Sequence, residues 1–570
     1  MVGNASVARL GTTFGLLRRT RAQISAQSVN PLVGRAALPK EQYSGSWVVS
    51  HLLADRAEKF PEKVAIYAEH ENLTYSQLAQ RAASFAGGLS QLGVAPGERV
   101  ATMLPASTAY LTAWFGVVWA GAIDVPINND FKGEFLRHIL VESGARTIVI
   151  DAQFLSRLDG LEIPELRRVI CVGDSQNNKV IPFEQVATGN AIGPVDREER
   201  DIAYVMYTSG TTGPSKGAIL PNRTALWNAF AWIDILALTA NDVAYSMFPL
   251  FHVTARSAVV TSSFWAGASV VLRSGFSVSR FWEDIRATNA TFFAYMGSVV
   301  HLLNAEPKHE LDSQNAVRVA FGAAAPPAII TDFEQRFGLE LLEVYGSTEL
   351  GPASAPAPGK VKRGTMGRIC PHLDIQIQDP ESGVALANGL PGEICARPTV
   401  PMGLFAGYWS RPDATIDAFR DLWFHTGDRG LLDEDGYLVF VDRIKDCIRR
   451  RGENISSFEV ERSVNEHPAV RESAAYAVPS DVGEEEVMVA VVLEPNHTID
   501  PMQLREFCEQ TMPRFAVPAF VRIVSELPKT PSQRVQKFML RAEGVVAGSF
   551  DIRPVRSKKN APAIGVEETQ

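Results

Sequence analysis

The stretch from Tyr207 to Gly217 reads YTSGTTGPSKG and begins at the last residue of the apolar run AYVMY (203–207). Its glycines, threonines and serines leave few side-chain obstructions, so backbone N–H groups and hydroxyls can surround a chain of phosphates. Lys216 adds a positive charge near its end. The pattern therefore predicts a phosphate-binding loop that follows a buried strand, because a plain Gly/Ser linker needs neither the strand nor the lysine.

The loop differs from that of the P-loop nucleoside triphosphatases. Their pattern, G-x-x-x-x-G-K-[ST], would require Gly at position 215 and Ser or Thr at position 217. The sequence has Ser215 and Gly217 instead. A different phosphate-binding fold is therefore expected.

Outward from this loop, short β-branched runs alternate with amphipathic helical stretches between about residues 47 and 345. This alternation predicts an α/β fold of mostly parallel sheets with helices on them. After Glu349, strands follow one another with little helix between them, which indicates a β-rich subdomain. Beyond Asp442 the pattern predicts a small, mobile α+β domain, with a helix opened by the S-x-x-E capping box of residues 456–459. The expected strands include VAIY (64–67), RVATML (99–104), YVMYT (204–208), VRVAF (317–321), LDIQIQ (373–378), GEICAR (392–397), LVFVDR (438–443) and VMVAVVL (487–493).

Four parts follow from these changes of pattern: an N-terminal extension (1–44), a large domain (45–441), a small domain (442–545) and a tail (546–570). The first 40 residues carry five Arg and one Lys but no acidic residue. We expect a disordered extension of a cytoplasmic protein, with an organelle transit peptide as the alternative.

Composition excludes several classes of protein. The chain has 570 residues, is 46% hydrophobic and carries a formal net charge of −9, which argues against a dedicated nucleic-acid binder. Its 5 cysteines form no C-x-x-C pair, so neither a zinc site nor a disulfide framework is indicated, and a reducing compartment fits best. The uncharged run of residues 106–123 reads as a buried helix leading into a strand, and no membrane span is expected.

Further motifs, in order, give the chain a family resemblance. FPLFHV (248–253), GAAAP (322–326), YGSTE (345–349), WFHTGD (423–428) and VDRIKD (441–446) follow the phosphate loop. Together they resemble the adenylate-forming superfamily, in its acyl-CoA synthetase branch, over about residues 45–542. The resemblance implies an acid–thiol ligase that joins a small carboxylic acid to ATP as acyl-AMP, with loss of pyrophosphate, before the CoA thiol displaces AMP. It implies ATP or acyl-AMP, CoA and Mg²⁺ as ligands.

The same resemblance assigns nucleotide-binding residues. Tyr345 would lie near adenine, Thr348 would contact the α-phosphate, Glu349 would hold Mg²⁺ and Asp428 would bind the ribose hydroxyls. A carboxylate suits the tasks of Glu349 and Asp428, because it binds hard cations and can accept hydrogen bonds from two hydroxyl groups. The other implied nucleotide contacts are Thr208, Ser209, Gly210, Thr211, Thr212, Gly213, Lys216, Gly322, Ala323, Ala324, Gly346, Ser347 and Arg443.

Resemblance also assigns residues around the acyl group and CoA. His252 would lie beside the reacting carboxylate, although a histidine among apolar residues is as well explained by core packing. Lys445 would form the pivot between the two domains. Gly452 and Glu453 would line the channel for the CoA arm after the small domain rotates. Arg449, Arg450 and Arg451 are candidates for the CoA phosphates, or else a solvated basic turn.

One motif departs from the family pattern. Near the C-terminus the family carries LPKTPxGKxxK, whose second lysine stabilises the acyl-to-phosphate transition state, but here the sequence is LPKTPSQRVQK (527–537). Gln533 replaces the Gly, and Arg534 stands at the position of the catalytic lysine. A guanidinium is broad and planar, whereas an ammonium is a compact charge. Losing one such electrostatic stabiliser costs on the order of 3 kcal/mol, or about 100-fold in rate.

We therefore predict an enzyme that makes the thioester from acyl-AMP and CoA but is impaired in adenylation, and that relies on a separate adenylating enzyme. The alternative is a complete two-step synthetase in which Arg534 or Lys537 does the lysine's work. A non-catalytic nucleotide- or acyl-binding protein is the alternative of another class, but it should have lost Glu349 or Asp428. The sequence suggests an apolar acid without identifying it, and it leaves the oligomeric state open.

Overall fold

The computed structural model describes residues 46–208, 215–323, 325, 327–443, 447–480, 484–528, 535 and 537–553. The extension predicted for residues 1–44 lies outside this range. So do several residues that the sequence singles out, and these are named below where they matter.

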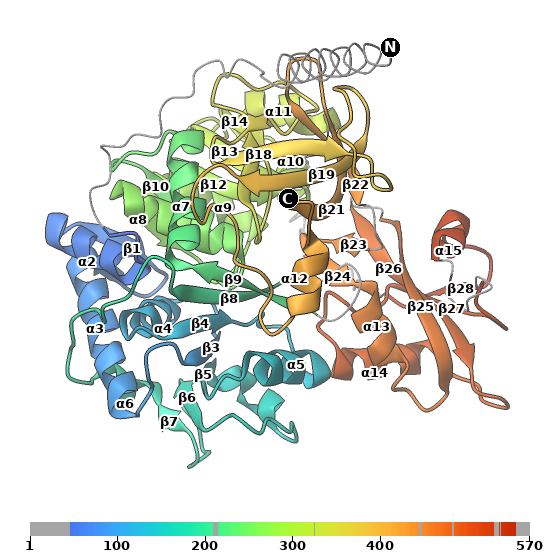
Figure 1. The fold of residues 1–570 in the computed structure, drawn as a ribbon, viewed down its shortest axis with the longest axis horizontal. Helices are drawn as coiled ribbons and strands as arrows, with labels where there is room; N and C mark the ends of the chain where they lie inside the picture. Colours follow the sequence, from blue (N-terminus) through green and yellow to red (C-terminus); the bar gives the residue numbers. More distant parts are fainter. Residues whose placement is uncertain are drawn as a thin grey trace, which may run out of the picture. The chain divides into compact units, whose positions relative to one another are not determined.

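Within the described residues, two seven-stranded sheets carry the first part of the chain (Figure 1). Their orders are β7-β6-β5-β3-β4-β8-β9 and β14-β13-β12-β10-β11-β1-β2, and all pairings are parallel except those of β9 and β2 at the edges. The predicted α/β class is confirmed. The strands are β1 (Val64–Tyr67), β2 (Asn72–Thr74), β3 (Arg99–Met103), β4 (Ile123–Pro126), β5 (Thr147–Asp151), β6 (Arg168–Val172), β7 (Ile181–Pro182), β8 (Ile202–Thr208), β9 (Lys216–Pro221), β10 (Val243–Ser246), β11 (Ser269–Leu272), β12 (Phe292–Met296), β13 (Val319–Ala323) and β14 (Glu340–Glu343).

Some of the helices between these strands, α3 and α4 among them, begin at side-chain caps. Thr74 and Gln77 form a reciprocal capping box at the start of α3, and the Ser107 hydroxyl accepts from Tyr110 N at the start of α4. α4 covers most of the uncharged run, and among the described residues no helix is long and apolar enough to cross a membrane. The helices are α2 (Val49–Lys59), α3 (Tyr75–Gln91), α4 (Thr108–Trp119), α5 (Gly133–Ser143), η1 (Ala152–Leu158), α6 (Phe183–Ala187), α7 (Asn222–Leu236), η2 (Thr254–Thr261), α8 (Ser262–Ala266), α9 (Val278–Thr288), α10 (Gly297–Ala305) and α11 (Pro327–Phe337).

The expected β-rich subdomain follows. An antiparallel sheet orders β18-β19-β21-β20, with β22 paired to β21, and a smaller one orders β15-β16-β17. The domain boundary predicted at residue 441 falls inside β22, because its pairing with β21 continues to Arg443. These elements are β15 (Tyr345–Ser347), β16 (Gly351–Ala355), β17 (Arg368–Ile369), β18 (Leu373–Gln378), β19 (Gly392–Pro398), α12 (Pro412–Ala418), β20 (Phe419–Arg420), β21 (Trp423–Leu432) and β22 (Leu438–Arg443).

The C-terminal part is the predicted α+β unit, with the sheet β25-β26-β27-β28 (orange to red in Figure 1). Alternate residues of β26 enter two apolar clusters: Val487 and Val489 join one, and Met488 and Ala490 join the other. This period of two means that both faces of the sheet are buried. The elements are β23 (Cys447–Arg450), β24 (Glu453–Ser456), α13 (Ser457–Val464), β25 (Val470–Pro479), β26 (Glu485–Leu493), α14 (Pro501–Thr511), β27 (Phe520–Ile523), α15 (Lys537–Glu543) and β28 (Ser549–Asp551).

The C-terminal unit extends beyond residue 545, where the sequence predicted its end. Residues 546–570 were expected to be an unstructured tail, but β28 lies within that range and pairs antiparallel with β27. Ile552 is also buried in the cluster that contains Val487. A three-residue edge strand lacks the apolar run on which the sequence prediction relied.

Candidate active site

The phosphate-loop prediction falls on a hairpin between β8 and β9. The register pairs Thr208 with Lys216, so the loop starts and ends at neighbouring positions. Thr208 Oγ1 lies 3.4 Å from the Lys216 carbonyl oxygen, and Lys216 Nζ lies 5.1 Å from the centre of the Tyr408 ring. The predicted contacts Ser209, Gly210, Thr211, Thr212 and Gly213 lie outside the described residues.

Glu349 lies directly beside this hairpin. Its carboxylate is buried and accepts from Thr208 Oγ1 at 3.3 Å and from the Tyr408 hydroxyl at 3.1 Å. Burial and the Glu349 charge raise the pKa of Tyr408, so its phenol stays protonated and donates. A carboxylate and a hydroxyl oxygen next to a phosphate loop form a donor set that suits Mg²⁺. The sequence did not single out Tyr408, because an isolated tyrosine carries no motif.

Gly322, near the end of β13, and Gly346 of β15 have no room for a side chain. A Cβ on Gly322 would lie 2.0 Å from the Tyr295 carbonyl oxygen. A Cβ on Gly346 would lie 2.3 Å from the Gly351 carbonyl oxygen. Ligands of parallel sheets bind at the carboxyl ends of the strands, which is where this crowded backbone lies. Ala324 lies outside the described residues.

Tyr345 and Asp428 meet although 83 positions separate them. The Tyr345 hydroxyl donates to Asp428 Oδ2 at 2.8 Å, and the Asp428 side chain is buried. Tyr345, Gly346 and Ser347 form β15, and Thr348 follows in the turn to β16. Arg443 stands opposite Asp428 in the pairing of β21 with β22. The predicted adenine and ribose residues are thus brought together.

His252 contacts a residue of the small domain. Its Nε2 lies 3.1 Å from Glu453 Oε1. Burial raises the pKa of Glu453, but His252 and Arg449 outweigh burial and hold the pKa below its usual value. Arg451 and Gly452 both have positive φ, as the tip of a tight hairpin between β23 and β24 requires, and a Cβ on Gly452 would lie 3.2 Å from Met296. The predicted CoA loop therefore lies at the end of β12, beside His252.

The three consecutive arginines, each a predicted candidate for the CoA phosphates, have different environments. Arg450 is buried, donates to the Phe515 and Val517 carbonyls and pairs with Glu486 at 2.5 Å, so it belongs to the small-domain core. Arg451 is exposed at the hairpin tip, and the Arg449 backbone N–H donates to Glu485. Alternation along β23 explains the difference between Arg449 and Arg450, because successive side chains point to opposite faces, and Arg451 lies beyond the end of β23.

Arg534 and Lys445 lie outside the described residues. Lys537, the other candidate for the lysine's work, is described. Its Nζ donates to Ser457 Oγ at 2.7 Å and pairs with Glu461 at 2.6 Å. Both partners belong to α13, so the amine is engaged within the small domain.

A second contact joins the small domain to the phosphate loop. Glu459 Oε1 accepts from Ser215 N at 2.6 Å and from Ser215 Oγ at 2.8 Å. The His138 ring nitrogen Nε2 donates to the Ser215 carbonyl at 2.9 Å. The sequence predicted Glu459 only as a helix-capping residue, because a contact 244 positions away leaves no local signal.

Comparison with known proteins agrees with this arrangement. Residues 53–409 match the AMP-binding enzyme family, and residues 459–534 match the AMP-binding enzyme C-terminal domain. Crotonobetaine/carnitine–CoA ligase of Salmonella typhimurium is 29% identical over 505 residues, which cover 85% of this chain and 97% of that protein.

Solved structures give the same picture. o-Succinylbenzoate CoA synthetase (MenE) of Bacillus subtilis, bound with a product analogue, is 23% identical with a TM-score of 0.76, over 88% of this chain and 99% of that one. ATP-bound MatB of Rhodopseudomonas palustris is 26% identical with a TM-score of 0.64, over 86% and 98%. The chain belongs to the AMP-binding enzyme family, in the acyl-CoA ligase branch of the adenylate-forming enzymes. It is an acyl-CoA ligase or a related adenylate-forming enzyme that acts through an acyl-AMP.

Proposed function

We propose that this enzyme forms acyl-CoA from acyl-AMP and CoA readily and makes acyl-AMP poorly. In the thioester step the CoA sulfur attacks the acyl carbon of acyl-AMP, the bond to the phosphate oxygen breaks, and AMP leaves. The observation that carries the proposal is the hairpin tip at Gly452, which lies against Met296 beside His252. The family resemblance implies this placement for the thioester step.

The residues have separate tasks in this proposal. Asp428 and Tyr345 hold the nucleoside, Glu349 and Thr208 hold the phosphate side, and His252 lies at the acyl end. Mg²⁺, when bound, neutralises phosphate charge. Gly452 and Glu453 line the path of the CoA arm, and exposed Arg451 remains a candidate for a CoA phosphate, whereas Arg450 does not, because its guanidinium is already paired.

The weak step follows from Arg534. A guanidinium at the position of the family's lysine keeps the charge but cannot present it as a compact point. Lys537 is a poor substitute, because its amine would first have to break its contacts with Glu461 and Ser457 of α13. A complete two-step synthetase remains the second candidate, and cytoplasmic location and an apolar acid remain predictions.

The test compares the wild type with Arg534→Lys on a panel of acids, with ATP, Mg²⁺ and CoA, and detects acyl-CoA by mass spectrometry. We expect Arg534→Lys to make at least about 100-fold more thioester than the wild type. Synthetic acyl-AMP of the same acid should then restore the wild type to the level of the variant. Arg471→Lys, an exposed change in the same domain, is the matched control.

Equal rates from acid and ATP would reject impaired adenylation and leave the two-step synthetase. Failure of the wild type to use acyl-AMP, under conditions in which Arg534→Lys makes acyl-CoA, would reject thioester competence. Failure of both enzymes to bind AMP or ATP in calorimetry would reject the nucleotide site itself.

A further inference from the structure

A bulge in β21 carries Asp428. Glu393 of β19 is paired with Arg429 and Cys395 with His425, so Ile394 alone faces the three residues from Thr426 to Asp428. Extra residues in one strand bend it and remove its backbone groups from the ladder. Gly427 has a φ of 73°, which only glycine adopts without strain. The position of Asp428 therefore depends on what holds this bulge.

Side chains form hydrogen bonds with the backbone groups that the bulge removes from the strand pairing. Glu393 Oε1 accepts from Gly427 N at 3.1 Å. Thr426 Oγ1 donates to the Ile394 carbonyl at 2.8 Å and accepts from Asp428 N at 3.0 Å. Glu393 is only 5% exposed, so its hydrogen bond is shielded from water. A buried N–H without a partner is costly, which makes the carboxylate the anchor of the bulge.

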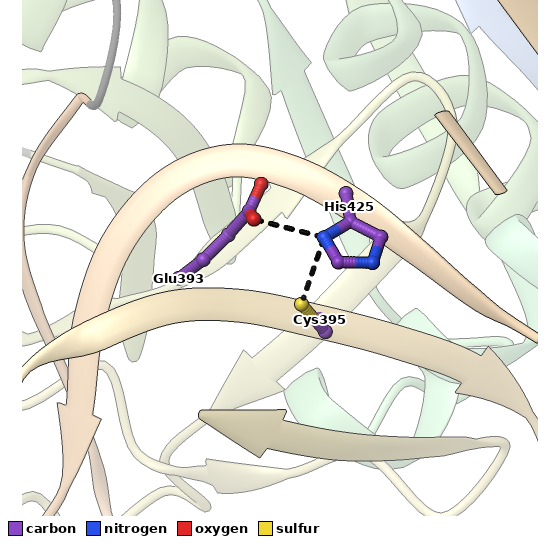
Figure 2. Close-up of side chains that lie close together, drawn as sticks. All are labelled: Glu393, Cys395 and His425. Carbon is purple, nitrogen blue, oxygen red and sulfur yellow. Dashed lines mark hydrogen bonds and ion pairs between the residues drawn. The ribbon is translucent and has the colours of Figure 1, made fainter. Parts of the chain in front are cut away.

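Two neighbours, His425 and Arg420, hold Glu393 in turn, and Figure 2 shows His425 beside the carboxylate. His425 Nδ1 lies 2.8 Å from Glu393 Oε2, and we assign its proton to Nδ1, which donates to the carboxylate. Arg420 Nη2 lies 3.5 Å from the same oxygen. Cys395 Sγ lies 3.4 Å from Nδ1, and burial together with the Glu393 charge raises the pKa of Cys395 to about 12. The thiol is therefore neutral and packs against the imidazole.

Glu393, Cys395 and His425 could also suggest a metal site, because their ligand atoms lie within 4.8 Å of one another. Two distances argue against it. The 2.8 Å from Nδ1 to Oε2 is that of a hydrogen bond, and the Arg420 guanidinium lies 2.9 Å from the same nitrogen. A cation already lies where the metal would bind.

We propose that Glu393 is a positioning residue for Asp428: its carboxylate, held by His425 and Arg420, fixes the Gly427 backbone and thereby places the nucleotide-binding carboxylate. This inference rests on the proposed role of Asp428. Loss of Glu393 lets the bulge relax, so Asp428 no longer meets Tyr345 and the ribose in one fixed place. The acyl and CoA ends of the site, around His252, should be unaffected.

The experiment measures the Kd of AMP by calorimetry, and the KM values for acyl-AMP and CoA, in Glu393→Ala, Glu393→Gln and Asp428→Ala. We expect Glu393→Ala to weaken AMP binding about tenfold and to raise the KM for acyl-AMP similarly, while the KM for CoA stays constant. Glu393→Gln keeps an oxygen that accepts from Gly427 and should stay within about threefold of the wild type. Asp374→Ala removes an exposed carboxylate from the same sheet and is the matched control.

The outcomes distinguish the positioning role of Glu393 from the proposed ribose contact of Asp428. If Asp428→Ala weakens AMP binding and Glu393→Ala does not, the positioning role is wrong and the role of Asp428 stands. If Asp428→Ala leaves AMP binding unchanged, the proposed ribose contact fails. If Glu393→Ala does not fold, half-exposed Arg420→Ala replaces it: a rise of about threefold in the Kd of AMP supports the proposal, and no rise refutes it. Stoichiometric zinc that is lost on His425→Ala would also refute it.

Discussion

Arg256 offers the most direct test of how the large domain is held together, because its charged side chain is fully buried. It lies in η2, a π-helix, and pairs with Asp124 of β4 at 2.5 Å. It also donates to the Tyr110 hydroxyl and to the Leu250 carbonyl, both at 3.1 Å. The guanidinium therefore ties η2 to the neighbouring sheet and to the segment that carries His252.

The structure sets the magnitude of the effect. Arg256→Met removes the cation and leaves Asp124 with the hydrogen bond that it accepts from the Thr102 hydroxyl at 2.8 Å. Breaking a buried pair from one side typically costs about 3–5 kcal/mol, because an uncompensated charge stays behind. Removing both charges avoids this penalty, so Arg256→Met with Asp124→Leu should recover at least about 2 kcal/mol of the loss.

Urea unfolding followed by the fluorescence of the 9 tryptophans measures both variants, and one of these, Trp114, has its ring centre 4.1 Å from the Arg256 guanidinium carbon. The midpoints of the unfolding transitions are compared at constant slope. A loss below about 1 kcal/mol for Arg256→Met would refute the reasoning. So would a double variant no more stable than the single one.

Three further predictions concern single residues. Gly322→Ala should weaken AMP binding at least about tenfold, because its Cβ would lie 2.0 Å from a backbone oxygen; calorimetry checks this, and unchanged affinity contradicts it. Burial lowers the pKa of His372 from 6.5 to about 4, so its contribution to stability is complete above pH 6.5 and is lost as the pH falls toward 4. Between pH 7 and pH 5 the wild type should lose roughly 2 kcal/mol from this residue, and His372→Phe should flatten that slope in urea titrations. Lys537→Met should destabilise the small domain by about 1–3 kcal/mol, because it leaves Glu461 without this hydrogen-bonding partner, but it should leave pyrophosphate exchange unchanged; abolished exchange would make Lys537 the adenylating lysine.

Local patterns predicted the elements well, because each was encoded within a short stretch. The alternation of β-branched runs with amphipathic stretches gave the parallel sheets, and the uncharged run around α4 proved to be a buried helix. The small domain's end was missed because β28 is short and its stability comes from pairing with β27. Ile552, which directly follows β28, is buried in the core.

The direction in which side chains point was the main feature of the site that the sequence did not predict. The run Arg449–Arg451 looks uniform in sequence, yet the hairpin of β23 and β24 turns Arg450 inward and leaves Arg451 at the tip. The sequence did not indicate a role for Glu393. That role depends on a bulge in the pairing of β19 with β21, and the register of two strands cannot be read from the sequence. Such contacts between distant strands are decided by tertiary packing.

Two of the contacts between the domains are made by carboxylates of the small domain, and they bear on the order of the reaction. Glu453 meets His252 at the acyl end, and Glu459 meets the N–H and hydroxyl of Ser215 at the end of the phosphate loop. Donors of this kind favour anions, and the triphosphate of ATP would be an anion in the same neighbourhood. A carboxylate at Ser215 and a bound triphosphate repel each other, so this placement of the small domain favours a site from which pyrophosphate has gone. This agrees with the proposed thioester step, because pyrophosphate has left the site before CoA reacts with acyl-AMP.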